Sequence, residues 1–314
     1  MSTLLYYPYF AFCFLLSLLP FWLLYFLSDL FYFPLYYLIR YRRRVVRRNL
    51  ETSFPEKSKA EIIAIEKKFY SFFCDYALET LKLLSISKKN MKRRMRFEGM
   101  DELHQTFAEG RSAAAYLGHY CNWEWISSLP LSVDEGAICG QIYHRLRNAA
   151  SDRLFLHLRG RMGAMSIPMN ETLRQIITLH REDKRFVIGF IADQSPKPFN
   201  IHHWTNFLNQ ETPVFTGTER IVKKAGLVTY YAEVTRPKRG YYVCRFKKLV
   251  DNPKEYSDYE ITDLYMRELE AMIRREPAYW LWSHKRWKWT PERFHSMFEQ
   301  GADGRVRVKK EENE

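Results

Sequence analysis

The sequence predicts an α/β protein in which a mostly parallel sheet is flanked by helices, preceded by an N-terminal hydrophobic helix or helix pair that anchors the chain to a membrane. Two observations carry this prediction. From Ser112 onward, short apolar runs alternate with amphipathic stretches, as in proteins built on parallel sheets. At the other end of the chain, the stretch from Met1 to Ser28 contains no charged side chain.

The apolar segment from Leu4 to Ile39 is interrupted by one charged residue, Asp29, and is long enough for a membrane helix of about 20 residues. A cleaved signal peptide is disfavoured because no positive charge precedes the apolar run. Pro8, Pro20 and Pro34 interrupt a continuous helix, and the many tyrosines and phenylalanines suit the membrane interface. A helix pair lying partly in one leaflet therefore competes with a single span.

Six arginines follow directly, between Arg40 and Arg48. Basic residues that flank an apolar segment mark its cytoplasmic side, and they also attract anionic lipids. Both interpretations stay open. In either case, the rest of the chain is expected on the cytoplasmic face of a bacterial inner membrane.

The remaining sequence divides into predicted elements of two kinds. Helical spacing of apolar residues extends from Ser58 to Ser85, where Ser58 and Glu61 form a predicted capping box, and a short polar helix is expected at 100–109. Strands are predicted at 112–117, 137–143, 186–192, 228–234 and 241–246, and helices at 123–129, 171–182, 217–225 and 261–275. We therefore expect a membrane anchor over 1–40, one α/β domain over 41–300 and a disordered polar tail over 301–314.

Charge and cysteine content limit the possible functions. The net charge of +13 and the pI near 9.4 favour an anionic partner, which includes lipid phosphates, acidic carrier proteins and nucleic acids. The five cysteines are scattered and show no CxxC pair, so neither a disulfide framework nor a structural zinc site is expected. No metal or organic cofactor is predicted.

The stretch from Gly118 to Trp125 carries the strongest chemical signal. An apolar strand ends at Gly118, and His119 and Glu124 follow around a turn into a helix. On one continuous helix these two side chains would point about 140° apart, so they can meet only if His119 lies in the turn. In that arrangement Glu124 could fix the imidazole tautomer while His119 takes a hydroxyl proton. A structural turn histidine is the competing interpretation.

Several segments along most of the chain resemble, in order, the late acyltransferases of lipid A biosynthesis, a family of lauroyl and myristoyl transferases within the His-x-x-x-x-Asp/Glu lipid acyltransferases. The similar segments are Arg48-Asn49-Leu50, Phe54-Pro55-Glu56, Gly118 to Glu124, Tyr143 to Arg145, Arg159-Gly160-Arg161, Ala192 to Ser195, Pro213 to Thr218 and Pro277 to Lys288.

The resemblance implies transfer of a fatty acyl chain from acyl carrier protein to a hydroxyl of a lipid A precursor at the bacterial inner membrane. It implies that His119 is the catalytic base, Glu124 its partner and Arg161 a catalytic or phosphate-binding arginine. A purely structural ion pair is the alternative for Arg161. The other expected substrate-binding residues are Asn122, Arg145, Arg159, Asp193, Gln194 and Arg286.

The sequence departs from the family pattern where His144 and Leu146 flank Arg145, and where Ser195 follows Asp193-Gln194. These departures leave a lysophospholipid or an amino-acid-linked lipid open as the acceptor. A rival of another class is a non-catalytic membrane-tethered binder of anionic lipid or nucleic acid. Its support comes from the net charge and from the basic, tryptophan-rich segment 280–289, which we interpret instead as core and interfacial packing, so no nucleic acid partner is expected.

Overall fold

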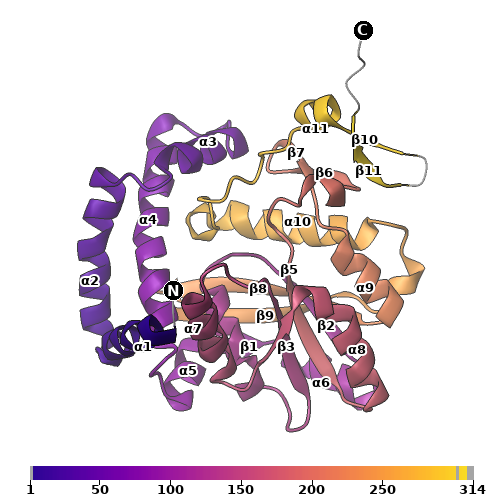
Figure 1. Cartoon of the computed structure of the whole chain (residues 1–314), viewed down its shortest axis with the longest axis horizontal. Coiled ribbons are helices and arrows are strands. Elements are labelled where there is room, and N and C mark those ends of the chain that lie inside the picture. The colour runs from indigo at the N-terminus through magenta and orange to yellow at the C-terminus, as the bar shows by residue number, and fades with distance from the viewer. Residues whose placement is uncertain (1–2, 302–303, 310–314) are drawn as a thin grey trace.

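A computed structural model of the chain describes residues 3–301 and 304–309. Its centre is a seven-stranded sheet of order β1-β9-β8-β2-β5-β3-β4, in which every neighbouring pair is parallel except β8 and β9. The strands are β1 (Met95–Glu98), β2 (Ala113–Leu117), β3 (Ile138–Tyr143), β4 (Met165–Pro168), β5 (Phe186–Ile191), β8 (Val228–Lys238) and β9 (Tyr241–Val250). The predicted mostly parallel sheet flanked by helices is confirmed (Figure 1).

Helices cover both faces of this sheet. Along β2, Ala115 and Leu117 face one layer, whereas Tyr116 points to the other and its ring lies 4.9 Å from that of Tyr265. The helices are α3 (Arg43–Ser53), α4 (Lys59–Lys82), α5 (Lys88–Arg94), α6 (Met100–Ala108), the 3-10 helix η2 (Trp123–Leu131), α7 (Ala149–Gly160), α8 (Thr172–Arg181), α9 (Gly217–Ala225), α10 (Glu260–Arg275) and α11 (Pro291–Met297). Short 3-10 turns follow at η3 (Met169–Glu171), η4 (Pro198–Asn200), η5 (Pro253–Glu255) and η6 (Pro277–Tyr279).

The predicted strands and helices are present, with ends that differ by a few residues. The capping box of Ser58 and Glu61 at the start of α4 is also confirmed. The sequence patterns missed the two edge strands, β1 and β4, which pair on one side only and are four residues long. Strands this short and partly exposed leave little apolar alternation to detect. The patterns also missed α3, whose many charged residues obscure the apolar spacing, and α7.

The N-terminal apolar segment forms two helices, α1 (Thr3–Leu18) and α2 (Phe21–Phe33), and α2 continues into a π-helical turn, η1 (Pro34–Leu38). The break between the helices falls at Pro20, as the sequence suggested. In the part of the chain that the structure describes, one helical segment, Phe21–Leu38, is long and apolar enough to cross a membrane. It runs beside α4 over much of that helix's length (Figure 1).

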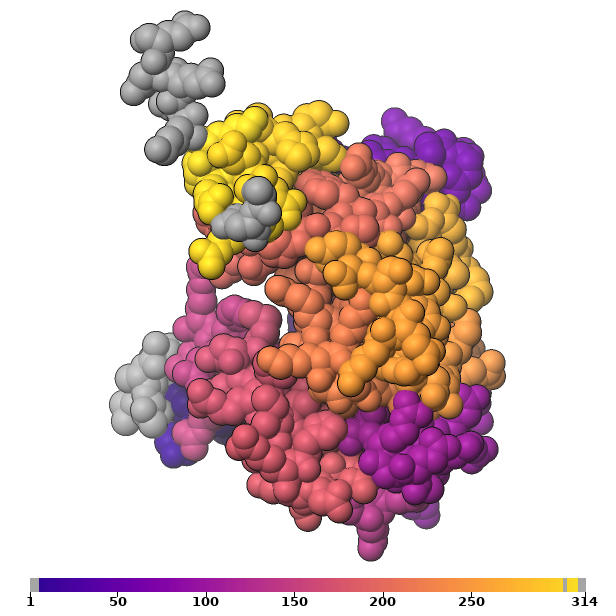
Figure 2. All heavy atoms as spheres, turned by 90° about the vertical axis from the view of Figure 1, so that its right-hand side faces the viewer, coloured from indigo at the N-terminus to yellow at the C-terminus, as the bar shows by residue number. Residues whose placement is uncertain are grey.

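The end of the domain packs over a short hairpin of β6 (Trp204–Phe207) and β7 (Gln210–Pro213). Ile201, Phe294, Phe298 and Val306 form a small separate core there. In Figure 2 the yellow C-terminal segment lies against the red-orange region. The predicted disordered tail over 301–314 lies partly outside the described residues. Within it, β11 (Val306–Val308) pairs antiparallel with β10 (Phe298–Gln300).

A buried carboxylate on α4 holds the two preceding elements. Glu66 has no exposed side-chain area and accepts hydrogen bonds from the Tyr36 hydroxyl (2.8 Å), Arg43 Nε (2.9 Å) and Arg47 Nε (2.6 Å). This one side chain therefore joins η1 and α3 to α4. The contact fixes how the apolar segment and the arginine cluster sit on the domain.

We predict that Glu66→Gln lowers the free energy of unfolding by about 1–3 kcal/mol, because the neutral amide cannot satisfy three donors that were bound to a carboxylate. Thermal unfolding of the full chain in detergent measures this loss. Glu56→Gln, at an exposed position in the preceding turn, is the matched control and should leave the transition unchanged. Equal stability of the two variants would contradict the anchoring role of Glu66.

Candidate active site

Two neighbouring parallel strands place the central residues of the site. Leu117 at the end of β2 is in register with Ile191 at the end of β5. His119 and Asp193 each follow two residues later, so they leave the same edge of the sheet side by side. This is the carboxyl end of the parallel strands, where sheets of this kind bind ligands.

The Asp193 carboxylate binds His119 through two atoms. Oδ1 lies 2.6 Å from the imidazole Nδ1, and Oδ2 accepts the backbone N–H of His119 at 2.8 Å. Oδ2 also accepts the indole N–H of Trp280 at 2.8 Å. The carboxylate is 1% exposed, whereas the His119 side chain is 20% exposed. The pair therefore has a buried acid and an imidazole that reaches solvent.

The groups around Asp193 keep its carboxylate ionised. Burial alone would raise the pKa of Asp193, but the His119 charge and the hydrogen bonds from His119 and Trp280 outweigh it and hold the pKa below its usual value. An ionised Asp193 favours the imidazole tautomer that carries its proton on Nδ1. The lone pair of Nε2 then faces the Gln194 side-chain amide, whose nitrogen lies 3.4 Å away. This tautomer can accept a proton at Nε2.

The C-terminal tryptophan segment holds the histidine turn in place. Tyr120 and Trp280 form an isolated antiparallel bridge, and the backbone N–H of Leu281 donates to the carbonyl of His119 at 3.1 Å. Cys121 adopts a left-handed φ of 51° and donates its N–H to the carbonyl of Tyr279. The sequence pattern predicts only packing for this segment and does not reveal the direct bond from Trp280 to Asp193.

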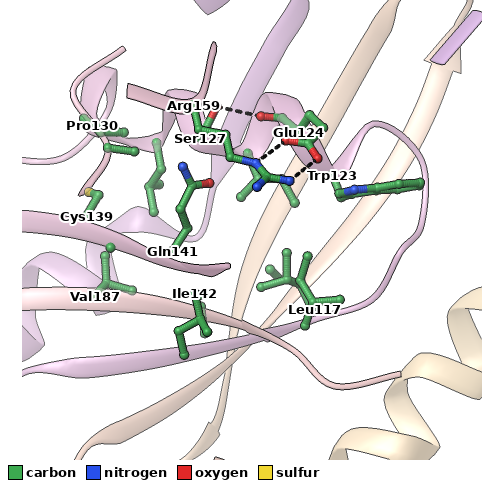
Figure 3. A pocket seen from close by; sticks show the side chains of 18 of the residues that line it. Leu117, Trp123, Glu124, Ser127, Pro130, Cys139, Gln141, Ile142, Arg159 and Val187 are labelled. Carbon is green, nitrogen blue, oxygen red and sulfur yellow. Dashed lines mark hydrogen bonds and ion pairs between the residues drawn. The ribbon is translucent and has the colours of Figure 1, made fainter. Parts of the chain in front are cut away.

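In the structure Glu124 is bonded to Arg159 and not to His119, so the His119–Glu124 contact expected from the sequence is not formed. Its two oxygens accept from Arg159, at 2.7 Å from Nε and 2.6 Å from Nη2, and the carboxylate is 4% exposed (Figure 3). The physical reason is that the register of β2 with β5 places Asp193 beside His119, where its carboxylate binds Nδ1 of the imidazole. Glu124 and Arg159 instead form a bidentate pair that joins η2 to α7.

Asn122 belongs to a buried polar network. Its amide nitrogen donates to Glu79 Oε2 at 2.9 Å, and its oxygen accepts the backbone N–H of Trp125 as the N-cap of η2. The Tyr242 hydroxyl donates to the same Glu79 oxygen at 2.7 Å. Burial raises the pKa of Glu79, and the nearby Asp75 adds to that effect. Asn122 is fully buried, so the structure places it behind the site surface.

The three other predicted arginines lie in different surroundings. Arg161 caps the end of α7, and its NH1 donates to the backbone carbonyls of Leu83 and Ile86. Arg145 is exposed in the loop after β3. Arg286 is fully buried and donates to the carbonyl of Pro213 at 2.8 Å, and burial lowers its pKa to about 10 against the opposing influence of Asp193.

An apolar cavity opens beside the histidine. It lies between one face of the sheet and η2, and Trp123, whose ring is 5.1 Å from that of His119, forms part of its wall. Glu124 and Arg159 supply charge at one side, while most of the lining is aliphatic (Figure 3). The further lining side chains include Leu117, Ile126, Leu129, Pro130, Cys139, Ile142, Ala164, Val187 and Ile191.

Two other side chains near the site bear on its chemistry. His284 Nε2 accepts the backbone N–H of Ser195 at 3.3 Å, and burial lowers the pKa of His284 to about 4, so this histidine is neutral. Cys121 is fully buried, and burial raises its thiol pKa well above the usual value, which disfavours a thiolate nucleophile. Among the described residues, no group of three or more histidine, cysteine or acidic side chains could hold a metal ion.

Comparison with known proteins identifies the family. The family model described as bacterial lipid A biosynthesis acyltransferase matches residues 1–289, which is most of the chain. No curated protein that was compared with the chain matches it. The chain therefore belongs to the bacterial lipid A biosynthesis acyltransferases, as its motifs indicated.

The turn before His119 depends on a glycine. A Cβ atom on Gly118 would lie 2.6 Å from Leu269 Cδ1 and 3.4 Å from Asp193 Oδ2, and Leu269 is fully buried. We predict that Gly118→Ala destabilises the protein by about 1–3 kcal/mol through overpacking and also lowers activity by displacing Asp193.

Thermal unfolding and acyl transfer measured on the same preparations check both effects. Gly217→Ala is the matched control, because its Cβ would meet no atom within 4 Å. Close approach to Leu269 further predicts that the effects of Gly118→Ala and Leu269→Ala are not additive. Additive effects would show that the contact is not the cause.

Proposed function

Given this family membership, we propose that the protein transfers a fatty acyl chain from acyl carrier protein to a hydroxyl of a lipid A precursor, on the cytoplasmic face of the bacterial inner membrane. One observation carries the proposal: the His119–Asp193 pair stands beside an apolar cavity, and Trp123 both contacts the His119 ring and lines that cavity. This combination supports a role for His119 as a general base that acts beside a site suited to a hydrocarbon chain.

The mechanism uses His119 as the base. Asp193 holds the imidazole with its proton on Nδ1, so Nε2 accepts the proton of the acceptor hydroxyl while the hydroxyl oxygen attacks the thioester carbonyl. The tetrahedral intermediate then collapses and breaks the carbon–sulfur bond. The leaving thiolate takes the proton back from the imidazolium, which returns His119 to its starting state. Base and orienting carboxylate are both side chains, so this reaction requires no metal or organic cofactor.

Arg159 is the arginine best placed to stabilise negative charge in this site. It lines the cavity, and its pair with Glu124 uses Nε and Nη2, so Nη1 takes no part in that pair. A guanidinium fixed in this way is a preorganised donor for the oxyanion or for a phosphate of the acceptor. Gln194, on the Nε2 side of His119, adds a second polar group close to the acceptor hydroxyl. Arg161, bound to two carbonyls, is assigned a structural role.

Charge on the surface supports acyl carrier protein as the donor. A groove beside α3 and the C-terminal segment is lined by five basic residues and by no acidic residue: Arg44, Arg48, Lys285, Lys288 and Arg293. Lys285 directly follows His284, which binds the backbone of Ser195 next to Gln194. An acidic carrier protein docked on this groove would be drawn to the same side of the domain as the active site, and the encounter would be accelerated by the opposite charges.

The decisive experiment is acyl transfer from labelled acyl carrier protein to a purified lipid A precursor and, separately, to a lysophospholipid. We predict transfer to the lipid A precursor, and a loss of about 10²–10⁴-fold in kcat for His119→Ala, which removes the base. Asp193→Asn should lose activity on the same scale, because the amide no longer fixes the required tautomer. His295→Ala, at an exposed position, is the control and should retain full rate.

Transfer to the lysophospholipid alone would replace the acceptor and keep the mechanism. Full activity in both His119→Ala and Asp193→Asn would contradict the mechanism itself. Acyl-coenzyme A tested in place of the carrier protein separates the donor question from the other two, since equal rates with both donors would remove the proposed role of the carrier protein.

The cavity predicts control over acyl length. Ala164 lies in its wall and is 9% exposed, so Ala164→Leu would fill part of the space. One methylene in such a pocket is worth about 10–200-fold in kcat/KM, so the variant should lose at least tenfold on the longest accepted chain and less on shorter ones. Competition among carrier proteins loaded with different chain lengths measures the shift. Ala108→Leu, on the exposed side of α6, should leave the profile unchanged.

A further inference from the structure

The N-terminal helices present their apolar side outward and their polar side to the domain. Large apolar side chains are exposed along both helices: Tyr7, Phe12, Phe14, Leu15 and Leu18 on α1, and Trp22, Phe26, Leu30, Phe31 and Phe33 on α2. The exposed fractions reach 71% at Trp22 and 62% at Phe26. An exposed apolar face of this extent marks a contact with a membrane or with another protein.

The segment Phe21–Leu38, which comprises α2 and η1, contacts charged groups of the domain along its whole length. Near its start, the Arg94 guanidinium lies 3.4 Å from the ring centre of Phe21, and Tyr25 donates to Glu79. Near its middle, Ser28 donates to Asp75 at 2.7 Å. At its end, Tyr36 donates to Glu66.

A network of charged side chains near the middle of α2 is partly exposed to solvent. Arg239 forms ion pairs at 2.7 Å with Asp29 of α2 and at 2.6 Å with Asp75 of α4. The side chains of Arg239 and Asp29 are 36% and 60% exposed. Asp29 is the ninth residue of the 18-residue segment Phe21–Leu38, so a membrane-spanning orientation would place this ion pair near the centre of the bilayer.

That orientation is energetically unfavourable. Charged side chains at the bilayer centre cost about 2.5–3.5 kcal/mol each even by the lower estimates, and the segment would also draw the attached face of α4 into the hydrocarbon. An orientation along the surface avoids this cost. The aromatic face then enters the region between head groups and acyl chains, and the Asp29–Arg239 edge stays in water.

Basic residues at the end of the segment indicate the kind of lipid. Arg40, Arg42, Arg43, Arg44 and Arg47 line one surface hollow directly after η1. Arg43 and Arg47 are already paired with Glu66, whereas Arg40 and Arg44 are exposed. Cationic residues beside an apolar membrane-contacting face favour a leaflet that contains anionic lipid.

We propose that α1, α2 and η1 lie along the surface of one anionic leaflet and do not cross the bilayer. This orientation goes beyond the proposed function and holds whichever lipid is the acceptor. It also brings the cavity close to the leaflet, because α1 packs on α7, where the Phe10 ring lies 5.4 Å from that of His157, and α7 carries Arg159 of the cavity wall.

The test measures the depth of single spin labels on the full chain in vesicles of phosphatidylglycerol and phosphatidylethanolamine. Labels are placed by Trp22→Cys, Phe26→Cys, Leu30→Cys and Phe33→Cys, and the five native cysteines are buried. A surface orientation predicts similar depths at all four sites, about 5–10 Å into the boundary region. A spanning helix places the first and last sites about 16 Å apart along the bilayer normal. A spread of that size would overturn the proposal.

Vesicle binding tests the lipid preference separately. Reversal of the two exposed charges in Arg40→Glu/Arg44→Glu should weaken binding to anionic vesicles by at least about fivefold per charge and leave binding to neutral vesicles unchanged. Lys184→Glu, in the turn between α8 and β5, is the control. Equal binding of the unchanged protein to neutral and anionic vesicles would overturn the anionic part of the proposal. Assembly of the helices into a protein dimer, with labels buried away from lipid, would overturn the whole of it.

Discussion

The carboxylate of Asp193 accepts hydrogen bonds from three donors that come from two separate parts of the chain: the backbone and imidazole of His119, and the indole of Trp280. A buried carboxylate stays ionised only when such donors compensate for its lost hydration. The arrangement therefore requires that β2, β5 and the C-terminal tryptophan segment all reach their final positions together. Gly118 is needed for the same reason, because a side chain there would meet both Leu269 and the carboxylate. The hydrogen bonds of Asp193 therefore hold both the fold and the active site together.

Helix α4 connects the N-terminal helices to the residues behind the active site. Three buried acids along it contact different partners: Glu66 holds η1 and α3, Asp75 holds Ser28 and Arg239, and Glu79 holds Tyr25 and Asn122. Glu79 thus binds a hydroxyl of α2 and the residue that caps η2 behind the catalytic turn. Through α2 and η1, the N-terminal segment is therefore bonded to the polar interior of the domain. A membrane anchor joined by a flexible linker would show no such contacts.

The sequence predicted more of the fold than of the site. Apolar runs identified the five longer strands of the sheet, because a buried parallel strand has an apolar stretch of sufficient length. The same criterion could not detect β1 and β4 at the edges. His119 was found because it follows a strand and a glycine, but its partner was assigned by closeness in sequence. The true neighbour, Asp193, lies 74 residues away and is brought close by the register of Leu117 with Ile191, which single-sequence patterns do not reveal.

The arginines show the same limit. Arg159 and Arg161 are two residues apart, on α7 and at its end, so they point in different directions. Sequence patterns alone do not show which of the two faces the site. In the structure Arg159 lines the cavity and Arg161 binds the carbonyls of Leu83 and Ile86. The exposed aromatic side chains of α1 and α2 were visible in the sequence. Their orientation relative to a membrane depended on which polar groups lie beneath them.

We propose that the Asp193 carboxylate, and not Glu124, sets the tautomer of the His119 imidazole. Nitrogen-15 NMR of the histidine-labelled protein tests it directly, with His119 assigned by its absence in His119→Gln. We expect the neutral form of the imidazole to carry its proton on Nδ1 in the wild type and in Glu124→Gln, and to lose that preference in Asp193→Asn. A tautomer that changes in Glu124→Gln and persists in Asp193→Asn would contradict it.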